Sequence, residues 1–314
     1  MDAGIIIQVV LLLVGFVFLI KGSDFFVDGA SSIAAILKVP TIIVGLTIVA
    51  FGTSAPEAAV SITSSLTGSN AMAVSNVIGS NLFNILMVIG IAALLGDLLM
   101  ERSVLNKDLP FLVGITLLLA IFILIGGDIS VIEGIILLLI LIGYVIYLIR
   151  SAGQSGATNY VEKPKLSTPK SIIFIIVGLA GIILGGDLVV DSASSIAMAL
   201  GMSETLVGLT IVAIGTSLPE LVTSITALRK GENQLVIGNV IGSNIFNILF
   251  VLGASSAISA IPISSSMIVD TAIMIAVTIL CFIFGKTQEK YDKKEGIVLV
   301  AIFIAYMAFA ILRN

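Results

Sequence analysis

Residues 44–90 read VGLTIVAFGTSAPEAAVSITSSLTGSNAMAVSNVIGSNLFNILMVIG, and residues 207–253 read VGLTIVAIGTSLPELVTSITALRKGENQLVIGNVIGSNIFNILFVLG. The two stretches align without a gap at an offset of 163 residues (220 − 57), which carries Glu57 onto Glu220 and Asn84 onto Asn247. A duplication kept for packing would preserve small and apolar positions, whereas the most alike positions here are polar. The repeat therefore predicts a polar functional site built from two related halves.

Composition places this repeat in a membrane. The chain has 314 residues, of which 58% are hydrophobic and 11% charged, with a mean hydropathy of +1.23; a soluble domain is roughly 25% charged. Apolar stretches recur at close to the ~20 residues that cross a bilayer as a helix. There is no His, and the single Cys281 has no partner for a disulfide, so any bound metal must be held by oxygen. A net charge of −4 without a basic block gives no reason to expect nucleic acid.

The predicted fold is an all-α membrane protein with ten transmembrane helices arranged as two inverted five-helix repeats. Spans are expected near residues 4–22, 41–66, 71–95, 109–126, 130–149, 170–190, 205–228, 234–258, 267–285 and 296–312. The stretches 24–38 and 187–203 could lengthen the first and sixth helices into tilted ones. Because each half holds an odd number of spans, the second half enters the membrane from the opposite side.

The halves are predicted as residues 1–149 and 171–314, joined by a linker at 150–170 that is too short and too polar to fold alone. With ten spans, every Lys and Arg except Arg313 lies on the side of that linker. Basic residues concentrate on the cytoplasmic side of membrane proteins. The linker is therefore expected in the cytoplasm and both termini outside the plasma membrane, with the first apolar segment retained as a helix rather than removed as a signal peptide.

Glu57 and Glu220 are interpreted as the only acids within deep apolar spans. Burying a carboxylate there costs about 3 kcal/mol unless it is paired or neutralised, and no Lys or Arg is expected nearby. Each Glu follows a proline, in GTSAPE and in GTSLPE, and Pro56 cannot donate to the carbonyl of Gly52. Carbonyl oxygens freed at this depth are tolerated where they line a cavity or an ion site. A cation site is favoured over a plain proline kink and over a pair of protonated acids.

Polar residues also follow one face of the next helix in each half. The spacing i, i+4, i+8 puts them in two stripes, Asn76, Ser80, Asn84 and Asn239, Ser243, Asn247. Such stripes can simply bond neighbouring helices, the role expected for Asn76 and Asn239, while the other four are expected to face the glutamates. The summed donor set is all oxygen and suits a hard cation such as Ca²⁺ or Na⁺. Two carboxylates can balance one Ca²⁺ but cannot hold it together with several Na⁺, so competition offers a basis for exchange.

On these motifs, GTSAPE with SNVIGSNLFN and GTSLPE with GNVIGSNIFN, the sequence resembles the calcium/cation antiporter superfamily, specifically the prokaryotic sodium/calcium exchangers, over essentially its whole length. The resemblance implies an antiporter rather than an enzyme, which transports Ca²⁺ and Na⁺ at about three Na⁺ for each Ca²⁺. It gives no reason to expect a cofactor or a protein partner. It also implies the ligands: Glu57 and Glu220 shared by both ions, carbonyls of Thr53 and Thr216 for Ca²⁺, hydroxyls of Ser54, Ser80, Ser217 and Ser243 for Na⁺, carbonyls of Ala50 and Ala213, and Asn84 and Asn247 lining the centre.

Some relatives, including potassium-dependent exchangers, carry Asp at the position of Asn84 or of Asn247. Because both positions are Asn here, potassium co-transport is less expected. The nearest alternative is a Ca²⁺/H⁺ antiporter, in which a glutamate cycles protons. An intramembrane lipid phosphatase would need a buried Arg, and every Arg is expected at a membrane edge or loop. A metalloprotease would need HExxH, and a channel fits mirrored half-sites less well than alternating access does.

Overall fold

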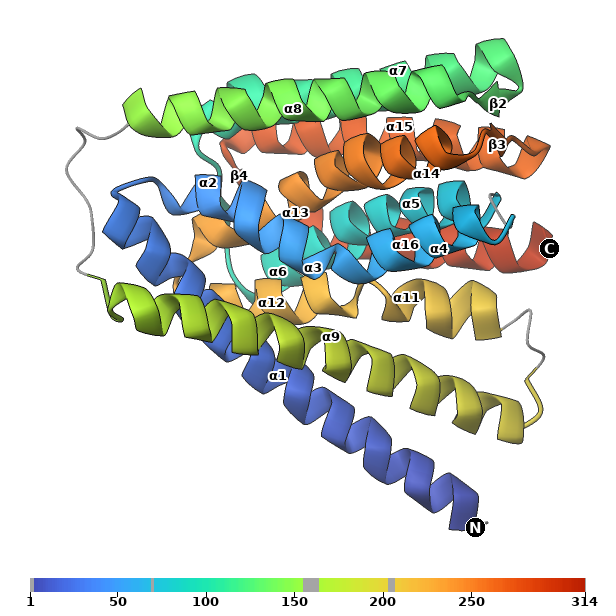
Figure 1. The fold of residues 1–314 in the computed structure, drawn as a ribbon, viewed down its shortest axis with the longest axis horizontal. Helices are drawn as coiled ribbons and strands as arrows, with labels where there is room; N and C mark the ends of the chain where they lie inside the picture. Colours follow the sequence, from blue (N-terminus) through green and yellow to red (C-terminus); the bar gives the residue numbers. More distant parts are fainter. Residues whose placement is uncertain (1–2, 69–70, 155–163, 203–206, 314) are drawn as a thin grey trace.

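The structure, a computed structural model, describes residues 3–68, 71–154, 164–202 and 207–313. Figure 1 shows a bundle of helices, and two short two-stranded sheets join some of its loops. The first half contains α1 (Ala3–Leu37), α2 (Thr41–Val44), η1 (Gly45–Val49), α3 (Ala50–Thr53), α4 (Ala55–Leu66), α5 (Ala71–Phe83), η2 (Asn84–Ile89), α6 (Gly90–Leu95), β1 (Leu98–Leu99), η3 (Val104–Asp108), α7 (Leu109–Gly126), β2 (Asp128–Ile129) and α8 (Val131–Gln154). The second half contains α9 (Thr168–Ala199), η4 (Gly208–Val212), α11 (Ala213–Gly215), α12 (Leu218–Arg229), α13 (Asn233–Phe246), η5 (Asn247–Leu252), α14 (Gly253–Ile258), β3 (Ile261–Pro262), α15 (Ser265–Gln288), β4 (Lys290–Tyr291) and α16 (Lys293–Arg313), and the segments named η are π-helical.

The number of membrane spans is close to the predicted one. Within the described residues, eight helices are long and apolar enough to cross a membrane, or nine if the pair Thr41–Thr53 and Ala55–Leu66, bent by 49°, is a single broken span. The related segment of the second half, η4 through α12, follows residues 203–206, which lie outside the described part. An all-helical, multi-pass membrane protein is therefore confirmed, while the count of ten and the inverted relation stay predictions.

Two long helices, α1 and α9, pack along each other across one side of the bundle (Figure 1). Each is longer than the span first expected, because it continues through the stretch that could lengthen it. Glycines bring their backbones together: a Cβ added at Gly22 would lie 2.7 Å from the backbone nitrogen of Ile182, and one at Gly185 would lie 2.6 Å from that of Leu19. Small residues permit this close approach of helices in lipid.

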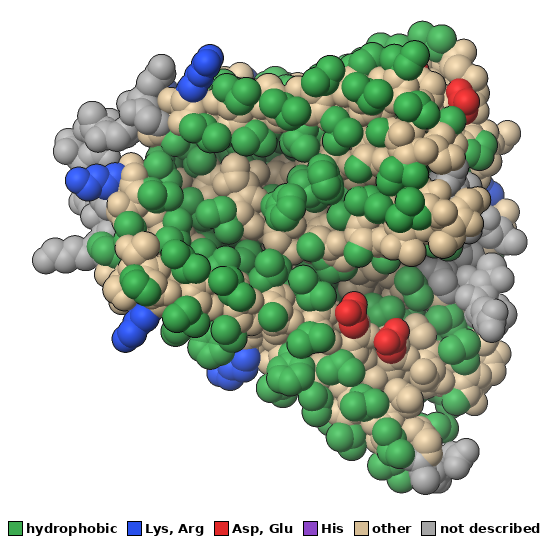
Figure 2. Space-filling view, in the orientation of Figure 1, with side chains coloured by type: hydrophobic (Ala, Val, Ile, Leu, Met, Phe, Trp, Pro, Cys, Tyr) green, Lys and Arg blue, Asp and Glu red, His purple; other side chains and the backbone are tan. Residues whose placement is uncertain are grey.

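The centre of the bundle is formed by the two spans that carry the polar stripes. The most apolar 18-residue window of Asn233–Ile258 is 94% buried and that of Met72–Leu95 is 78% buried, against 22% for Val131–Ala152. The outer helices instead expose large aliphatic side chains, for example Leu124 and Ile125. Figure 2 shows such side chains covering the visible face. A surface of this kind faces lipid, so α5, η2, α13 and η5 lie in the interior of the membrane domain.

Two antiparallel ribbons connect loops of the two halves. β1 pairs with β4, with Leu98 opposite Tyr291, and β2 pairs with β3, with Ile129 opposite Ile261. In Figure 1, α1 begins and α16 ends at one end of the bundle, whereas α8 ends and α9 begins at the other. On the face seen in Figure 2, most Lys and Arg side chains lie at the end where α8 ends. Both features agree with an even number of spans and with the predicted charge bias.

The residues of the linker are only partly described. Helix α8 continues to Gln154 and α9 begins at Thr168, and residues 155–163 lie outside the described part. Both ends of the predicted linker at 150–170 are therefore helical. For the residues between the two helices, the unfolded connection stays a prediction.

Candidate cation site

Each predicted site glutamate lies in the first turn of a helix that begins at a break. Glu57 follows Pro56 at the start of α4, and Glu220 follows Pro219 at the start of α12. Proline is well tolerated in a first helical turn, because the N–H that it lacks would have no partner within the helix there. The prolines thus begin new helices after the breaks. In Figure 1 the broken segment of the first half (α2, α3, α4) and that of the second half (α11, α12) run in opposite directions.

The breaks bring the two glutamates to the same place through crosswise hydrogen bonds. Ser54 Oγ donates to Glu220 Oε1 at 2.9 Å, and Ser217 Oγ donates to Glu57 Oε1 at 3.1 Å. Ser80 Oγ adds a longer bond of 3.5 Å to Glu57 Oε1. All four groups of the two short bonds are fully buried. Each carboxylate is therefore held by a hydroxyl from the opposite half, an arrangement that no local sequence pattern could reveal.

Further predicted residues surround this pair. Thr53 Oγ1 donates to the backbone oxygen of Val49 at 3.1 Å and to Asn239 Oδ1 at 3.0 Å. Ser243 Oγ lies 3.5 Å from Thr53 Oγ1 and 3.5 Å from the backbone oxygen of Ala50. Thr216 is buried near the end of the break, and Ala213 begins α11. Thr53 and Ala50 thus contact Ser243 of the opposite half. Ala213 and Thr216 lie at the related break of the second half.

Asn76 and Asn239 bond neighbouring helices, as expected for them. Asn76 Nδ2 donates to Ser61 Oγ at 3.0 Å and to the backbone oxygen of Glu57 at 3.3 Å. Asn239 Nδ2 makes the related bonds, to Ser224 Oγ at 3.0 Å and to the backbone oxygen of Glu220 at 3.4 Å. These amides hold the first turns of α4 and α12 against the stripe helices, and so they fix the backbone positions of both glutamates.

Two residues that were not predicted as site residues, Asn81 and Asn244, are fully or nearly fully buried beside the predicted Asn84 and Asn247. Asn84 Nδ2 donates to Asn244 Oδ1 at 3.3 Å, and Asn247 Nδ2 donates to Asn81 Oδ1 at 3.1 Å. Asn84 and Asn247 also begin the π-helical segments η2 and η5. Local π-helix is frequent at functional sites. The SN dipeptide that repeats in both halves was the available signal.

Four buried oxygens at the centre accept no hydrogen bond within the described residues. They are Glu57 Oε2, Glu220 Oε2, Asn84 Oδ1 and Asn247 Oδ1. Buried polar atoms are nearly always paired, so each such atom needs an explanation. The buried residues of the described part include no Lys or Arg that could neutralise the carboxylates. Nor do the described residues bring three His, Cys, Asp or Glu together. The arrangement suits a cation bound by two carboxylates and many neutral oxygens.

Glu57 and Glu220 are not the only buried acids in the described spans, although Asp108 lies near the end of its span rather than deep within it. Asp108 is 5% exposed and lies in the candidate span Val104–Gly126, which starts earlier than the predicted 109–126. Tyr144 donates its hydroxyl to Asp108 Oδ1 at 3.0 Å. The π-helical segment η3 extends the span and carries Asp108 inward. This acid accepts a hydrogen bond from Tyr144 of α8 and is not among the groups at the breaks.

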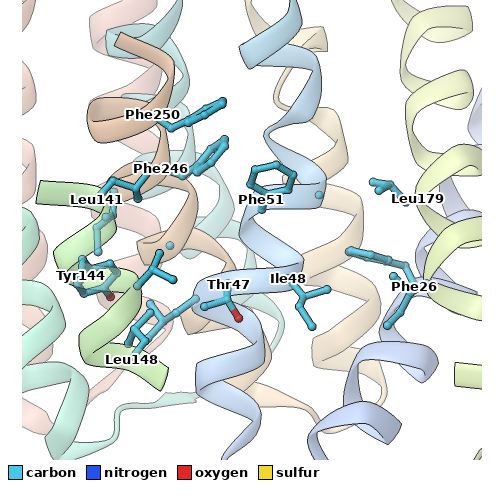
Figure 3. Close-up of a pocket in the computed structure, with 16 residues that line it drawn as sticks. Phe26, Thr47, Ile48, Phe51, Leu141, Tyr144, Leu148, Leu179, Phe246 and Phe250 are labelled. Carbon is cyan, nitrogen blue, oxygen red and sulfur yellow. The ribbon is translucent and has the colours of Figure 1, made fainter. Parts of the chain in front are cut away.

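The structure also has a cavity of about 500 Å³ (Figure 3). Its walls are mostly apolar and include Phe26, Phe51 and Phe246. Its two hydroxyl-bearing residues, Thr47 and Tyr144, donate their hydroxyls to the backbone oxygen of Ile43 and to Asp108. None of the predicted ligands lines it. The cavity therefore offers no charged group to an ion.

Comparison with known proteins agrees with the motifs. The family model described as sodium/calcium exchanger protein matches residues 7–150 and 170–312. The chain is 33% identical to the sodium/calcium exchanger MaX1 of Methanosarcina acetivorans, over 96% of this chain and 98% of that protein. It is 34% identical to the inner membrane protein YrbG of Escherichia coli, over 95% of each.

Among solved structures, the sodium-calcium exchanger NCX_Mj superposes with a TM-score of 0.86 at 32% identity, covering 97% of this chain and 98% of that one. These relatives confirm the expectation of a transporter rather than an enzyme. With most of its length matched by the family model and by full-length relatives, the chain belongs to the sodium/calcium exchanger family.

Proposed function

We propose that this protein exchanges Na⁺ for Ca²⁺ across the membrane by alternating access. The observation that carries the proposal is the set of four buried, unpartnered oxygens on Glu57, Glu220, Asn84 and Asn247, with no Lys or Arg among the buried residues of the described part. A cation bound between them would satisfy all four acceptors at once and balance the two carboxylates. Hard oxygen ligands favour Ca²⁺ and Na⁺ over softer metals.

The glutamates would be ligands shared by both ions. Carbonyls of Thr53, Thr216, Ala50 and Ala213, hydroxyls of Ser54, Ser217, Ser80 and Ser243, and the amides of Asn84 and Asn247 would complete the set. Ser54 and Ser217 donate to the glutamates across the two halves. A hydroxyl that accepts a cation can turn its proton outward, so the same contacts are compatible with an occupied site.

Exchange follows from charge. Two carboxylates balance one Ca²⁺, and they cannot hold Ca²⁺ and a full set of Na⁺ together, so either ion displaces the other. Two five-helix halves of opposite orientation would let the site open to one side at a time. Support for this inverted relation comes from the opposed directions of the two broken segments (Figure 1) and from the paired bonds of Asn76 and Asn239.

The protein would lie in the plasma membrane, with the linker at 150–170 in the cytoplasm and both termini outside, for the reason that nearly all Lys and Arg lie on the linker side of a ten-span chain. No resident cofactor or protein partner is required by this proposal.

Transport by the purified protein in proteoliposomes tests the coupling ion. Vesicles loaded with Na⁺ should take up ⁴⁵Ca²⁺ when diluted into Na⁺-free medium, and vesicles with a pH gradient alone should not. Uptake driven equally well by the pH gradient would favour a Ca²⁺/H⁺ antiporter, in which a glutamate carries the proton. Absence of uptake under either gradient, with ⁴⁵Ca²⁺ unbound at equilibrium, would overturn the cation site itself.

Proteoliposomes loaded with ⁴⁵Ca²⁺ and diluted into Na⁺ medium test electrogenicity. If about three Na⁺ exchange for each Ca²⁺, one net positive charge crosses in each cycle, and moving it through 100 mV is worth about 2.3 kcal/mol. An inside-negative potential set by K⁺ and valinomycin should speed Na⁺ entry coupled to Ca²⁺ exit, and an inside-positive one should slow it. Exchange rates that do not change with the membrane potential would indicate two Na⁺ or two H⁺ for each Ca²⁺.

A further inference from the structure

Asn81 and Asn244 are buried amides for which the proposed ligand set has no use. They occupy equivalent positions of the duplicated sequence, three residues before Asn84 and Asn247. Both are 2% exposed or less, in the crossing of α5 and η2 with α13 and η5. A buried amide that serves only packing is costly unless it is hydrogen-bonded, so their bonds show what they do.

Those bonds run crosswise between the halves. Asn81 Oδ1 accepts from Nδ2 of Asn247 at 3.1 Å, and Asn244 Oδ1 accepts from Nδ2 of Asn84 at 3.3 Å. The NH₂ group of each proposed ligand amide is thereby hydrogen-bonded to the opposite half, that of Asn84 to Asn244 and that of Asn247 to Asn81. The acceptor ends, Asn84 Oδ1 and Asn247 Oδ1, are the atoms left without a partner.

Orientation matters because an amide has two unlike ends. The oxygen can bind a cation, whereas the NH₂ group presents two donors and repels it. An Asn that could turn about its last side-chain bond would offer either end. Tying the NH₂ away from the centre leaves only acceptors facing the ion, and a site arranged in advance loses less free energy when the ion binds.

We propose that Asn81 and Asn244 are positioning residues, which fix the amides of Asn247 and Asn84 with their oxygens toward the transported cation. This inference rests on the proposed function of the site as a cation site. It assigns Asn81 to Asn247 and Asn244 to Asn84, so that each half orients the ligand of the other.

Asn81 and Asn244 are not held by the same number of hydrogen bonds. Asn81 Nδ2 also donates to the backbone oxygen of Asn244 at 3.3 Å. Asn244 Nδ2, in contrast, has no partner in the described part of the chain. Asn81 is therefore the more firmly held of the two, and its loss should affect ion binding more than the loss of Asn244 does.

Double-mutant cycles test the assignment. Asn81→Leu, of similar size but without an acceptor, should raise the Kd of ⁴⁵Ca²⁺ in equilibrium binding, and the KM of transport, by about 10-fold. The maximal rate should stay within about twofold, because the glutamates are untouched. Combined with Asn247→Ala, Asn81→Leu should add no further loss, since the amide it orients is gone. Combined with Asn84→Ala, its loss should add in full.

The mirror cycle should couple Asn244→Leu to Asn84→Ala and not to Asn247→Ala. A purely structural role predicts additive losses in every pair, or coupling without the crosswise pattern, and either result overturns the inference. If Asn81→Leu does not fold, Asn81→Ala, which also lacks an acceptor, takes its place in the same cycle.

The outcomes separate the two proposals. Binding of ⁴⁵Ca²⁺ needs no gradient, so the cycle can be measured even if H⁺ proves to be the coupling ion. Wild-type protein that binds Ca²⁺ without crosswise coupling refutes only the positioning roles. Wild-type protein that binds neither Ca²⁺ nor Na⁺ refutes the cation site and the positioning roles with it.

Discussion

The two copies of the duplicated sequence can be compared position by position at the offset of 163 residues. At the centre of the membrane they agree in contacts as well as in sequence. Ser54 and Ser217 each donate to the glutamate of the other half. Asn84 donates to Asn244, and Asn247 donates to Asn81, where the helices of the two halves cross.

At the ends of the broken helices the copies differ. Lys230, just after α12, lies 2.8 Å from Asp28 Oδ1 and 3.6 Å from Asp24 Oδ1. Its equivalent is Thr67, which donates to the backbone oxygen of Thr63 in its own helix. Asp187 and Asp191, the equivalents of Asp24 and Asp28, make no ion pair in the described residues.

The difference separates two kinds of constraint. Residues that meet between the halves are held to one arrangement, because a change in either copy leaves a buried polar group unpaired. Residues at the membrane faces are partly solvated, where an ion pair contributes little, and the copies have diverged there. Changes at the centre should therefore affect the protein more than changes at the faces.

The largest expected effect is loss of transport in both Glu57→Gln and Glu220→Gln. Each change removes a charged acceptor with little change of volume, and such a loss costs about 3 kcal/mol, or more than about 100-fold in rate. Because each Glu is bonded across the interface, the two variants should be equally impaired. Sodium-driven ⁴⁵Ca²⁺ uptake measures this, with Glu289→Gln, at an exposed glutamate, as the matched control.

Full transport by one glutamate variant but not the other would contradict the equivalence of the halves. Full transport by both would refute the assignment of the site. Loss of transport in Glu289→Gln as well would show that the assay responds to reconstitution rather than to ion binding.

The next prediction concerns the faces of the membrane. On a Cys281→Ser background, Lys165→Cys lies on the linker side of a ten-span chain and Ser265→Cys on the other. In intact cells an impermeant maleimide should label Ser265→Cys strongly and Lys165→Cys only after the cells are opened. Labelling of both positions in intact cells would show that the two lie on one face, and would reject the ten-span orientation.

Sequence patterns predicted some parts of this architecture and not others. Glu57, Glu220 and the prolines before them were predictable, because a carboxylate in an apolar span and a break at proline are local and physically costly. Asn81 was not, since the helical spacing leaves it outside the stripe of Asn76, Ser80 and Asn84, and its partner lies in the other half. The burial of Asp108 was also missed, because π-helix formation at η3 depends on packing rather than on propensity.

A smaller effect is expected at the interface of α1 and α9. Gly22→Ala and Gly185→Ala occupy equivalent positions, and each would force a Cβ within 3 Å of backbone atoms of the facing helix. Overpacking of this kind costs about 1–3 kcal/mol. Both should lower the thermal unfolding midpoint in detergent by similar amounts. Gly143→Ala, where no atom lies within 4 Å of the added Cβ, should leave the midpoint unchanged or slightly higher, and a drop as large there would indicate general loss of helix stability instead.

The smallest effect is expected at the ion pairs of Lys230. Lys230→Thr gives the second half the residue of the first, and it removes contacts whose side chains are 23–36% exposed. Pairs of this kind are worth less than about 1 kcal/mol. The unfolding midpoint should fall slightly at low ionic strength and hardly at all in about 1 M choline chloride, where the screening length is about 3 Å; choline avoids a transported cation.

Arg229→Thr, which changes the exposed neighbour of Lys230, should have no such salt-dependent effect. The converse change, Thr67→Lys, places a cation where Asp187 and Asp191 lie if the two faces are related by the inverted repeat. It should then raise the midpoint at low salt by about as much as Lys230→Thr lowers it. A midpoint unmoved by Thr67→Lys, beside a salt-dependent drop in Lys230→Thr, would mean that the backbones at the two faces have diverged along with the residues, and would confine the equivalence of the halves to the membrane interior.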